Sequence, residues 1–157
     1  MELNIYNWQV LKQYFPSIFF SKKDLQDILF KQISQHDLSD VKDTKEIDSI
    51  NVVFISSGEI KQLNKDFRKK DVVTDVLSFV IEEEDPLVGE VYICPEYVAK
   101  KYDYKEILRD IVHGFLHLLG EEHSKHFTGD NLPKEEMFVK QENMLQNILY
   151  EINNRAG

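Results

Sequence analysis

Residues 105–119 are apolar at most positions, and this segment constrains the fold more than any other part of the sequence. Its apolar side chains recur on nearly every side of a helix, which is typical of a helix buried within a protein. His113 and His117 lie inside the segment, four positions apart and therefore on one helix face. Because burying two imidazole rings without partners is costly, we expect this pair to have a specific ligand.

A third histidine follows close behind the pair. We expect Gly120 to end the helix in a left-handed conformation, so that His123 turns back toward His113 and His117. Three imidazoles with one position left to water describe a catalytic zinc site. The single cysteine, Cys94, excludes a four-cysteine zinc site. The sequence therefore predicts one zinc ion at the end of a buried helix, where bound water becomes a hydroxide nucleophile. The alternative is three unrelated structural histidines.

The remainder of the chain alternates between strand and helix patterns. We expect Ser21 and Ser57 to cap the helices that follow them, and residues 39–48 to form a loop. The expected elements are strands near residues 3–6, 50–55, 76–81 and 88–94, and helices near 22–36, after 57, over 105–119 and from Pro133. This order predicts a single α+β domain over residues 1–157, with a small mixed four-stranded sheet packed with helices.

Charge and hydropathy exclude several classes of protein. The net charge of −9 argues against coating nucleic acid by bulk attraction, although residues 61–70 form a basic strip with Asp66 as the one acid. The cations of this strip are Lys61, Lys65, Arg68, Lys69 and Lys70. Apolar runs fall far short of the ~20 residues that a membrane span needs, and the first residues do not resemble a signal peptide. We therefore expect a cytoplasmic protein without a membrane partner.

The histidine spacing also fits one class of zinc protease. The pattern H-x3-H-x2-G-x2-H is that of the metzincins, which place a glutamate, the general base, directly after the first histidine. Gly114 occupies that position in this sequence. A metallo-peptidase-like zinc hydrolase is therefore the poorer interpretation, because its base would be missing.

Three motifs together resemble one family. Residues 113–123 match the pattern H-G-x-L-H-L-x-G-Y-D-H except at Glu121 and Glu122, which replace the tyrosine and the aspartate. Residues 63–79 are similar to L-N-x-x-Y-R-x-x-D-x-x-T-D-V-L-S-F, with Phe67 in place of the tyrosine, and residues 89–94 are similar to G-D-I-x-I-S/C. These patterns are those of the YbeY family of bacterial endoribonucleases, and the resemblance extends over roughly residues 50–145.

The resemblance implies a single-strand-specific, zinc-dependent endoribonuclease of the cytoplasm. It would act in 16S rRNA 3′-end maturation and ribosome quality control, with single-stranded rRNA and the ribosome or its small subunit as partners. His113, His117 and His123 would be the metal ligands, and Arg68 would hold a phosphate or stabilise its developing charge. Glu122 is the nearest candidate for proton transfer. Attack by metal-bound hydroxide and attack by the RNA 2′-OH both remain open.

Other interpretations also remain open at this point. Arg68 could be a solvated cation at a helix end, and Glu122 a solvated loop acid. Asp75 could orient a ligand imidazole or cap a turn, while Ser78 could line a cleft or be structural. A ribosome-associated binding module with a largely structural metal is the alternative function. No oligomeric state follows from these patterns.

Overall fold

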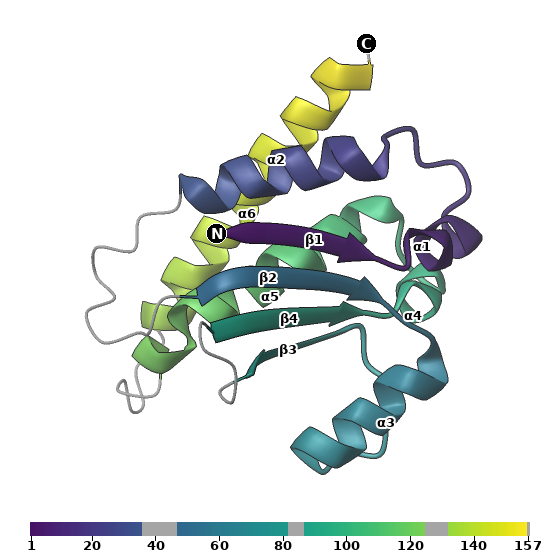
Figure 1. The fold of residues 1–157 in the computed structure, drawn as a ribbon, viewed down its shortest axis with the longest axis vertical. Coiled ribbons are helices and arrows are strands. Elements are labelled where there is room, and N and C mark those ends of the chain that lie inside the picture. The colour runs from purple at the N-terminus through teal and green to yellow at the C-terminus, as the bar shows by residue number, and fades with distance from the viewer. Residues whose placement is uncertain (36–46, 82–86, 125–131, 157) are drawn as a thin grey trace.

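The computed structural model describes residues 1–35, 47–81, 87–124 and 132–156; for residues 120–124, 132–135 and 156 it describes the backbone alone. Within these ranges the chain forms four strands and six helices (Figure 1). They are β1 (Glu2–Tyr6), α1 (Trp8–Tyr14), α2 (Lys22–Ser34), β2 (Ile47–Phe54), α3 (Ser57–Arg68), β3 (Val76–Ile81), β4 (Leu87–Ile93), α4 (Pro95–Ala99), α5 (Tyr104–Ser124) and α6 (Leu132–Ala156). Each helix in the described ranges is too short or too polar to span a bilayer.

The strands form one mixed sheet in the order β1-β2-β4-β3. β1 and β4 both run parallel to β2, whereas β3 pairs antiparallel with β4. The predicted α+β class and the four-stranded mixed sheet are therefore confirmed. The sequence patterns do not indicate α1 and α4, because helices of seven and five residues are too short to show a helical period.

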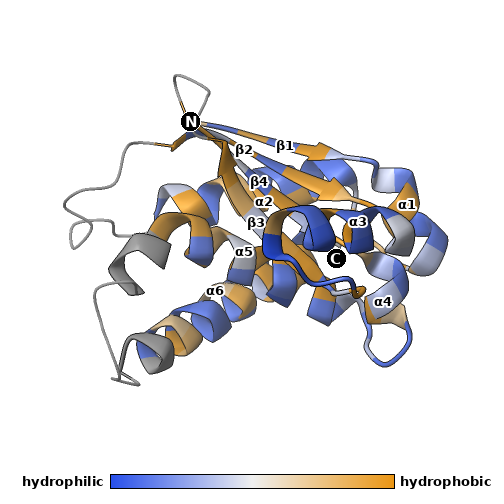
Figure 2. Cartoon of the chain, turned by 90° about the horizontal axis from the view of Figure 1, so that it is seen from below, coloured by the Kyte–Doolittle hydropathy of each residue, from blue (hydrophilic) through white to orange (hydrophobic). Residues whose placement is uncertain are grey.

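One face of the sheet carries most of the core. α2 packs on β1, α5 packs on β3 and β4, and α6 packs across both helices (Figure 1). Figure 2 views the molecule from another side and shows strands rich in hydrophobic residues, with α5 and α6 on one side of them. Ile111, Phe115 and Val91 are fully buried in this layer. Residues 105–119 thus form the buried helix that their apolar pattern predicts.

The opposite face carries α3 and a much smaller cluster. Side chains alternate between the two faces along each strand, so Ser78 and its partner Val91 face α5 while Phe79 and Glu90 face the other way. The fully buried Ile60 anchors α3 on this second face. The small cluster consists of Ile55, Ile60, Leu77 and Cys94, with Val53, Leu63, Val73, Phe79 and Tyr92 partly buried against it.

The two predicted helix caps have different outcomes. Ser21 caps α2 as expected, because its Oγ accepts a hydrogen bond from the backbone N–H of Asp24 at 3.0 Å. The cap of α3 is Ser56 and not Ser57. Glu59 follows Ser56 by three residues, and the two form a reciprocal capping box that Ser57 cannot form.

Two predicted boundaries are also wrong. The loop expected over residues 39–48 lies mostly outside the described residues, but Ile47 and Asp48 already belong to β2, because the parallel pairing of Ile47 with Leu87 extends the sheet. α5 does not end at Gly120 but continues to Ser124. Glycine adopts helical and left-handed backbone with similar ease, so its presence marks a possible helix end and does not impose one.

Candidate metal and nucleic-acid site

α5 turns His113 and His117 outward from the core. From Asp110 to Leu119 these two residues alone are partly exposed, while the others are buried. Their Nε2 atoms lie 2.8 Å apart, and their ring centroids are 4.4 Å apart with the planes at 75°. The i, i+4 spacing therefore brings two imidazole nitrogens to a common point, as the sequence predicts.

Gly114 lets α5 approach β4 closely. A Cβ atom built on this residue would lie 2.6 Å from Cγ1 of Val91, which is far inside van der Waals contact. The position after the first histidine therefore faces the sheet and has no room for a glutamate. This geometry removes the peptidase interpretation on steric grounds, because the general base of a metzincin would have to occupy that position.

Gln141 of α6 fixes the orientation of His113. Its Oε1 lies 2.7 Å from Nδ1 of His113, and its Nε2 donates to Oε2 of Glu142 at 3.1 Å. Gln141 Oε1 is therefore the acceptor and Nδ1 of His113 carries the proton, so the unprotonated Nε2 of His113 directs its lone pair at Nε2 of His117. Arg109 of α5 binds Glu142 through two hydrogen bonds of 3.0 Å, which lowers the pKa of that carboxyl group.

The role of Gln141 was missed from the sequence. The apolar stripe of α6 includes this position, and the helix period indicates a core residue there. The structure shows it buried, with its amide directed at a histidine. A polar residue within an apolar stripe was the available signal, since a buried amide requires hydrogen-bond partners.

The donor set fits a zinc ion in part. A tetrahedral ion with Zn–N bonds of about 2.0–2.1 Å would hold two nitrogen ligands about 3.3–3.4 Å apart. The observed 2.8 Å between the two Nε2 atoms is a few tenths of an ångström short, which small ring rotations would correct. The hydrogen bond from Nδ1 of His113 to an acceptor is also the usual support of a metal-ligating imidazole.

The third predicted ligand cannot be located. The side chains of His123 and Glu122 lie outside the described residues. Among the side chains that are described, no group of three or more histidine, cysteine or acidic residues is placed to hold a metal. The three-histidine site and the role of Glu122 therefore stay predictions.

Arg68 lies on the α3 side of the sheet. It is exposed in the last turn of α3, and its guanidinium carbon lies 6.0 Å from the ring centre of Phe79. Asn64 holds the following loop, because its side chain donates to the carbonyl of Val72 at 3.0 Å. α5, which carries the histidine pair, packs on the other face of β3.

A pair of carboxyl groups, one buried and one partly exposed, links α5 to the segment before β3. Asp110 lies one turn before His113 and is hydrogen-bonded to Asp75, while its Oδ2 has no partner among the described residues. Burial, followed by the charge and the hydrogen bond of Asp75, raises the pKa of Asp110 to about 9. Asp110 is therefore protonated at neutral pH. Asp75 also accepts a hydrogen bond from Thr74 at 3.3 Å, so its observed partners are a carboxyl and a hydroxyl group.

Two further candidate residues are buried. Ser78 is 8% exposed and faces the α5 side, as its pairing with Val91 requires. Cys94 is fully buried, with its Sγ 3.7 Å from Oγ of Ser57. Cys94 therefore packs as a small core residue.

The fold and the histidine pair together define a class of protein: a small α+β protein whose buried helix presents two imidazoles to one point. Comparisons with known proteins narrow this class. The family model described as Endoribonuclease YbeY matches residues 17–149. Endoribonuclease YbeY of Thermotoga petrophila is 40% identical over 105 residues, which cover 63% of this chain and 67% of that protein.

Two further relatives agree. Endoribonuclease YbeY of Staphylococcus aureus (strain JH9) is 31% identical over 141 residues, covering 78% of this chain and 83% of that protein. The solution structure of TM1509 from Thermotoga maritima is similar with a TM-score of 0.53 at 28% identity, covering 99% of this chain and 93% of that chain. The chain therefore belongs to the Endoribonuclease YbeY family, which confirms the resemblance seen in its three motifs.

Proposed function

We propose that this protein is a single-strand-specific, zinc-dependent endoribonuclease that acts in 16S rRNA 3′-end maturation and ribosome quality control. The observation that carries the proposal is the convergence of the His113 and His117 Nε2 atoms in a chain of the Endoribonuclease YbeY family. Cleavage of an RNA phosphodiester bond by hydrolysis needs an activated nucleophile and a cation for the phosphate. The histidine pair and the exposed cations of α3 are the candidates for these two roles.

His113, His117 and His123 would hold the zinc ion. When bound, the ion would lower the pKa of its water to about 7 and so supply hydroxide at neutral pH. Gln141 would keep His113 in the tautomer whose Nε2 can bind metal, because it accepts the Nδ1 proton. Glu122, next to His123 in sequence, would move a proton to or from the reacting oxygens.

Arg68 would position the scissile phosphate. Its planar guanidinium can form two parallel hydrogen bonds to phosphate oxygens, and its exposure leaves these donors accessible to RNA. Lys61, Lys65, Lys69 and Lys70 are exposed around it and would attract the RNA backbone. Single-stranded rRNA on the ribosome or its small subunit would be the substrate, and the reaction would take place in the cytoplasm.

The test compares wild type with His117→Ala on a single-stranded RNA that carries a small-subunit rRNA 3′ end. Zinc content is measured on the same samples by mass spectrometry. We expect His117→Ala to lose both bound zinc and cleavage. The matched control is His36→Ala, which removes a histidine far from the motif in sequence and should retain both.

The remaining outcomes separate the alternatives. Full cleavage by His117→Ala would contradict the proposal and indicate a contaminating nuclease. If neither protein cleaves RNA but both bind ribosomal particles, more tightly at lower salt, the binding-module interpretation gains support. The exposed cations of α3 are the feature that favours this second function.

A further inference from the structure

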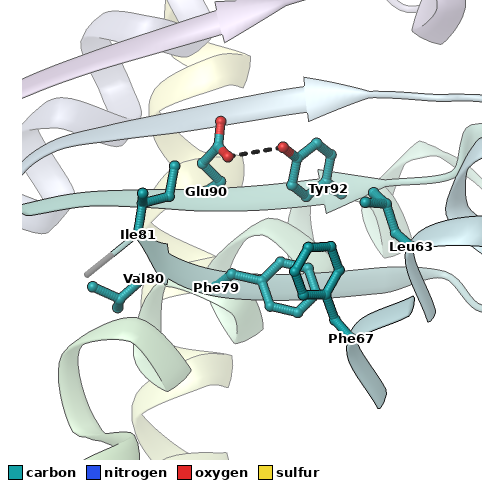
Figure 3. A pocket seen from close by; sticks show the side chains of 7 residues that line it. All are labelled: Leu63, Phe67, Phe79, Val80, Ile81, Glu90 and Tyr92. Carbon is teal, nitrogen blue, oxygen red and sulfur yellow. Dashed lines mark hydrogen bonds between the residues drawn. The ribbon is translucent and has the colours of Figure 1, made fainter. Parts of the chain in front are cut away.

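A groove opens on the α3 side of the sheet. It has a volume of about 470 Å³ and lies between α3 and the strands β3 and β4. Figure 3 shows the side chains that line it: Leu63, Phe67, Phe79, Val80, Ile81, Glu90 and Tyr92. A cavity of this size accommodates a molecule as large as a nucleobase.

Three aromatic rings form a continuous series in this groove. The ring centres of Phe67 and Phe79 are 5.1 Å apart, and those of Phe79 and Tyr92 are 6.2 Å apart. Phe67 is 65% exposed although it stands beside an apolar groove that could have buried it. A phenylalanine that keeps most of its surface in water, in contact with other rings, leaves an aromatic surface open for stacking.

The charge around the groove favours a polyanion as its ligand. Arg68 lies beside Phe79, and Lys65 and Lys69 are exposed at the same end of α3. Aromatic rings next to a positively charged track are the combination that binds single-stranded nucleic acid, since the rings stack on bases and the cations meet the phosphates. An uncharged apolar peptide or an uncharged lipid would gain nothing from these cations.

Glu90 adds a specific acceptor to the groove. Its Oε1 accepts a hydrogen bond from the Tyr92 hydroxyl at 2.8 Å, and among the described residues its Oε2 has no hydrogen-bond partner. Burial, followed by this bond, raises the pKa of Tyr92 to about 12, so the tyrosine remains a donor at neutral pH. Oε2 is thus available to accept a hydrogen bond from an amino group, as carboxylates do from N4 of cytosine.

We propose that this groove binds an unpaired RNA base, which stacks on Phe67 and Phe79 and donates its amino group to Glu90. The inference deepens the proposed function, because it names a substrate contact separate from the metal site. It also predicts that the groove prefers cytosine to uracil. Cytosine carries an amino group where uracil carries a carbonyl oxygen, and that oxygen would face the carboxylate of Glu90 without a hydrogen bond.

The test measures the affinity of metal-free full-length protein for fluorescent oligo(C) and oligo(U) hexamers by anisotropy. Wild type should bind oligo(C) at least about fivefold more tightly than oligo(U). Phe67→Ala should weaken binding of oligo(C) about 5- to 100-fold, whereas Phe67→Tyr, which keeps the ring, should bind like wild type. Glu90→Gln should reduce the preference for oligo(C), because an amide can also donate to uracil.

Tyr150→Ala is the matched control. Tyr150 is 68% exposed on α6, and its removal should leave both affinities unchanged. Equal affinities of wild type and Phe67→Ala would overturn the inference and leave the groove to a protein partner. Failure of wild type to bind either hexamer would overturn it as well.

The design separates this inference from the proposed function. Binding is measured without metal, and cleavage is measured with metal. If Phe67→Ala loses binding while metal-loaded wild type cuts no RNA, base binding in the groove is supported and the nuclease proposal is contradicted. If wild type cleaves RNA but its affinities do not depend on Phe67 or Glu90, the nuclease proposal is supported and base binding in the groove is contradicted.

Discussion

The two faces of the sheet differ in what covers them. On one face, α2, α5 and α6 enclose a large cluster of fully buried side chains, and the histidine pair lies at the surface of this layer. On the other face, α3 covers a small cluster and leaves aromatic and cationic side chains partly or wholly exposed. In Figure 1, α5 and α6 pass behind the strands, whereas α3 lies beyond β3 at the bottom of the view.

We infer that the densely covered face mainly stabilises the fold, whereas the α3 face is free to bind a ligand. Hydrophobic burial supplies most of the folding free energy, so the densely covered face should account for most of the stability. The α3 face can then carry exposed rings such as Phe67 without loss of the fold. Four predictions test this division, from the largest expected effect to the smallest.

The strongest test removes one phenylalanine ring from each face. Phe115→Ala deletes a fully buried ring on the covered face and should lower the free energy of unfolding by about 3–5 kcal/mol. Phe67→Ala should lower it by about 1 kcal/mol or less, because that ring is mostly exposed. Urea unfolding of both variants measures the difference. Similar losses would show that the two faces contribute equally.

A second test uses two glycines in helices on opposite faces. Gly114→Ala forces a Cβ atom into Val91 and should destabilise the protein by about 1–3 kcal/mol, even though alanine favours a helix. Gly58→Ala in α3 meets nothing within 4 Å and should be neutral or stabilising by up to about 1 kcal/mol. A neutral Gly114→Ala would mean that α5 can move away from β4.

The buried Asp110 makes stability on the covered face depend on pH. Its folded pKa of about 9 lies above the usual aspartate pKa of 3.8, so between these values the folded state binds a proton that the unfolded state has released. The free energy of unfolding should therefore fall as pH rises from about 4 to 9, by at most about 1.4 kcal/mol per pH unit from this group.

Asp110→Asn should remove this slope and stabilise the protein most at alkaline pH. The measurement is urea unfolding of metal-free protein at pH 5, 6, 7 and 8, with the exposed Asp48→Asn as the control. An unchanged slope in Asp110→Asn would contradict the elevated pKa. A slope lost also in Asp48→Asn would assign the effect to overall charge.

The smallest effects concern the two serine caps, one on each side of the sheet. Ser21→Ala removes the cap of α2 and Ser56→Ala removes the cap of α3, and each should cost about 1 kcal/mol. Circular dichroism melts measure both losses. Because a cap acts on local backbone groups, equal costs are expected on the two faces, in contrast to the phenylalanine pair. A loss below about 0.3 kcal/mol for Ser56→Ala would contradict its assignment as the cap.

Much of this architecture follows from local patterns in the sequence. The period of α5, the β-branched run of β2 and the spacing of His113 and His117 are properties of short segments, so they could be interpreted without a structure. The choice between Ser56 and Ser57 could also have been made from sequence. A glutamate stands three residues after Ser56, whereas Ile60 stands three residues after Ser57.

Other features depend on residues that are distant in sequence. The contact of Gln141 with His113 joins α6 to α5, and the hydrogen bond of Asp110 with Asp75 joins α5 to the segment before β3. The start of β2 at Ile47 depends on its pairing with Leu87. No local pattern specifies such partners, because they are set by how helices and strands pack.

The sequence by itself determined that this is an α+β protein of a recognisable family, with a buried helix that bears two histidines on one face. Only the tertiary structure decided that Gly114 is held against Val91, that Gln141 fixes the His113 tautomer, and that three aromatic rings meet beside Arg68. The physical reason is the separation of the interacting residues along the sequence. Helical and strand periods depend on neighbouring residues, whereas steric fit, hydrogen-bond partners and grooves arise when distant segments pack together.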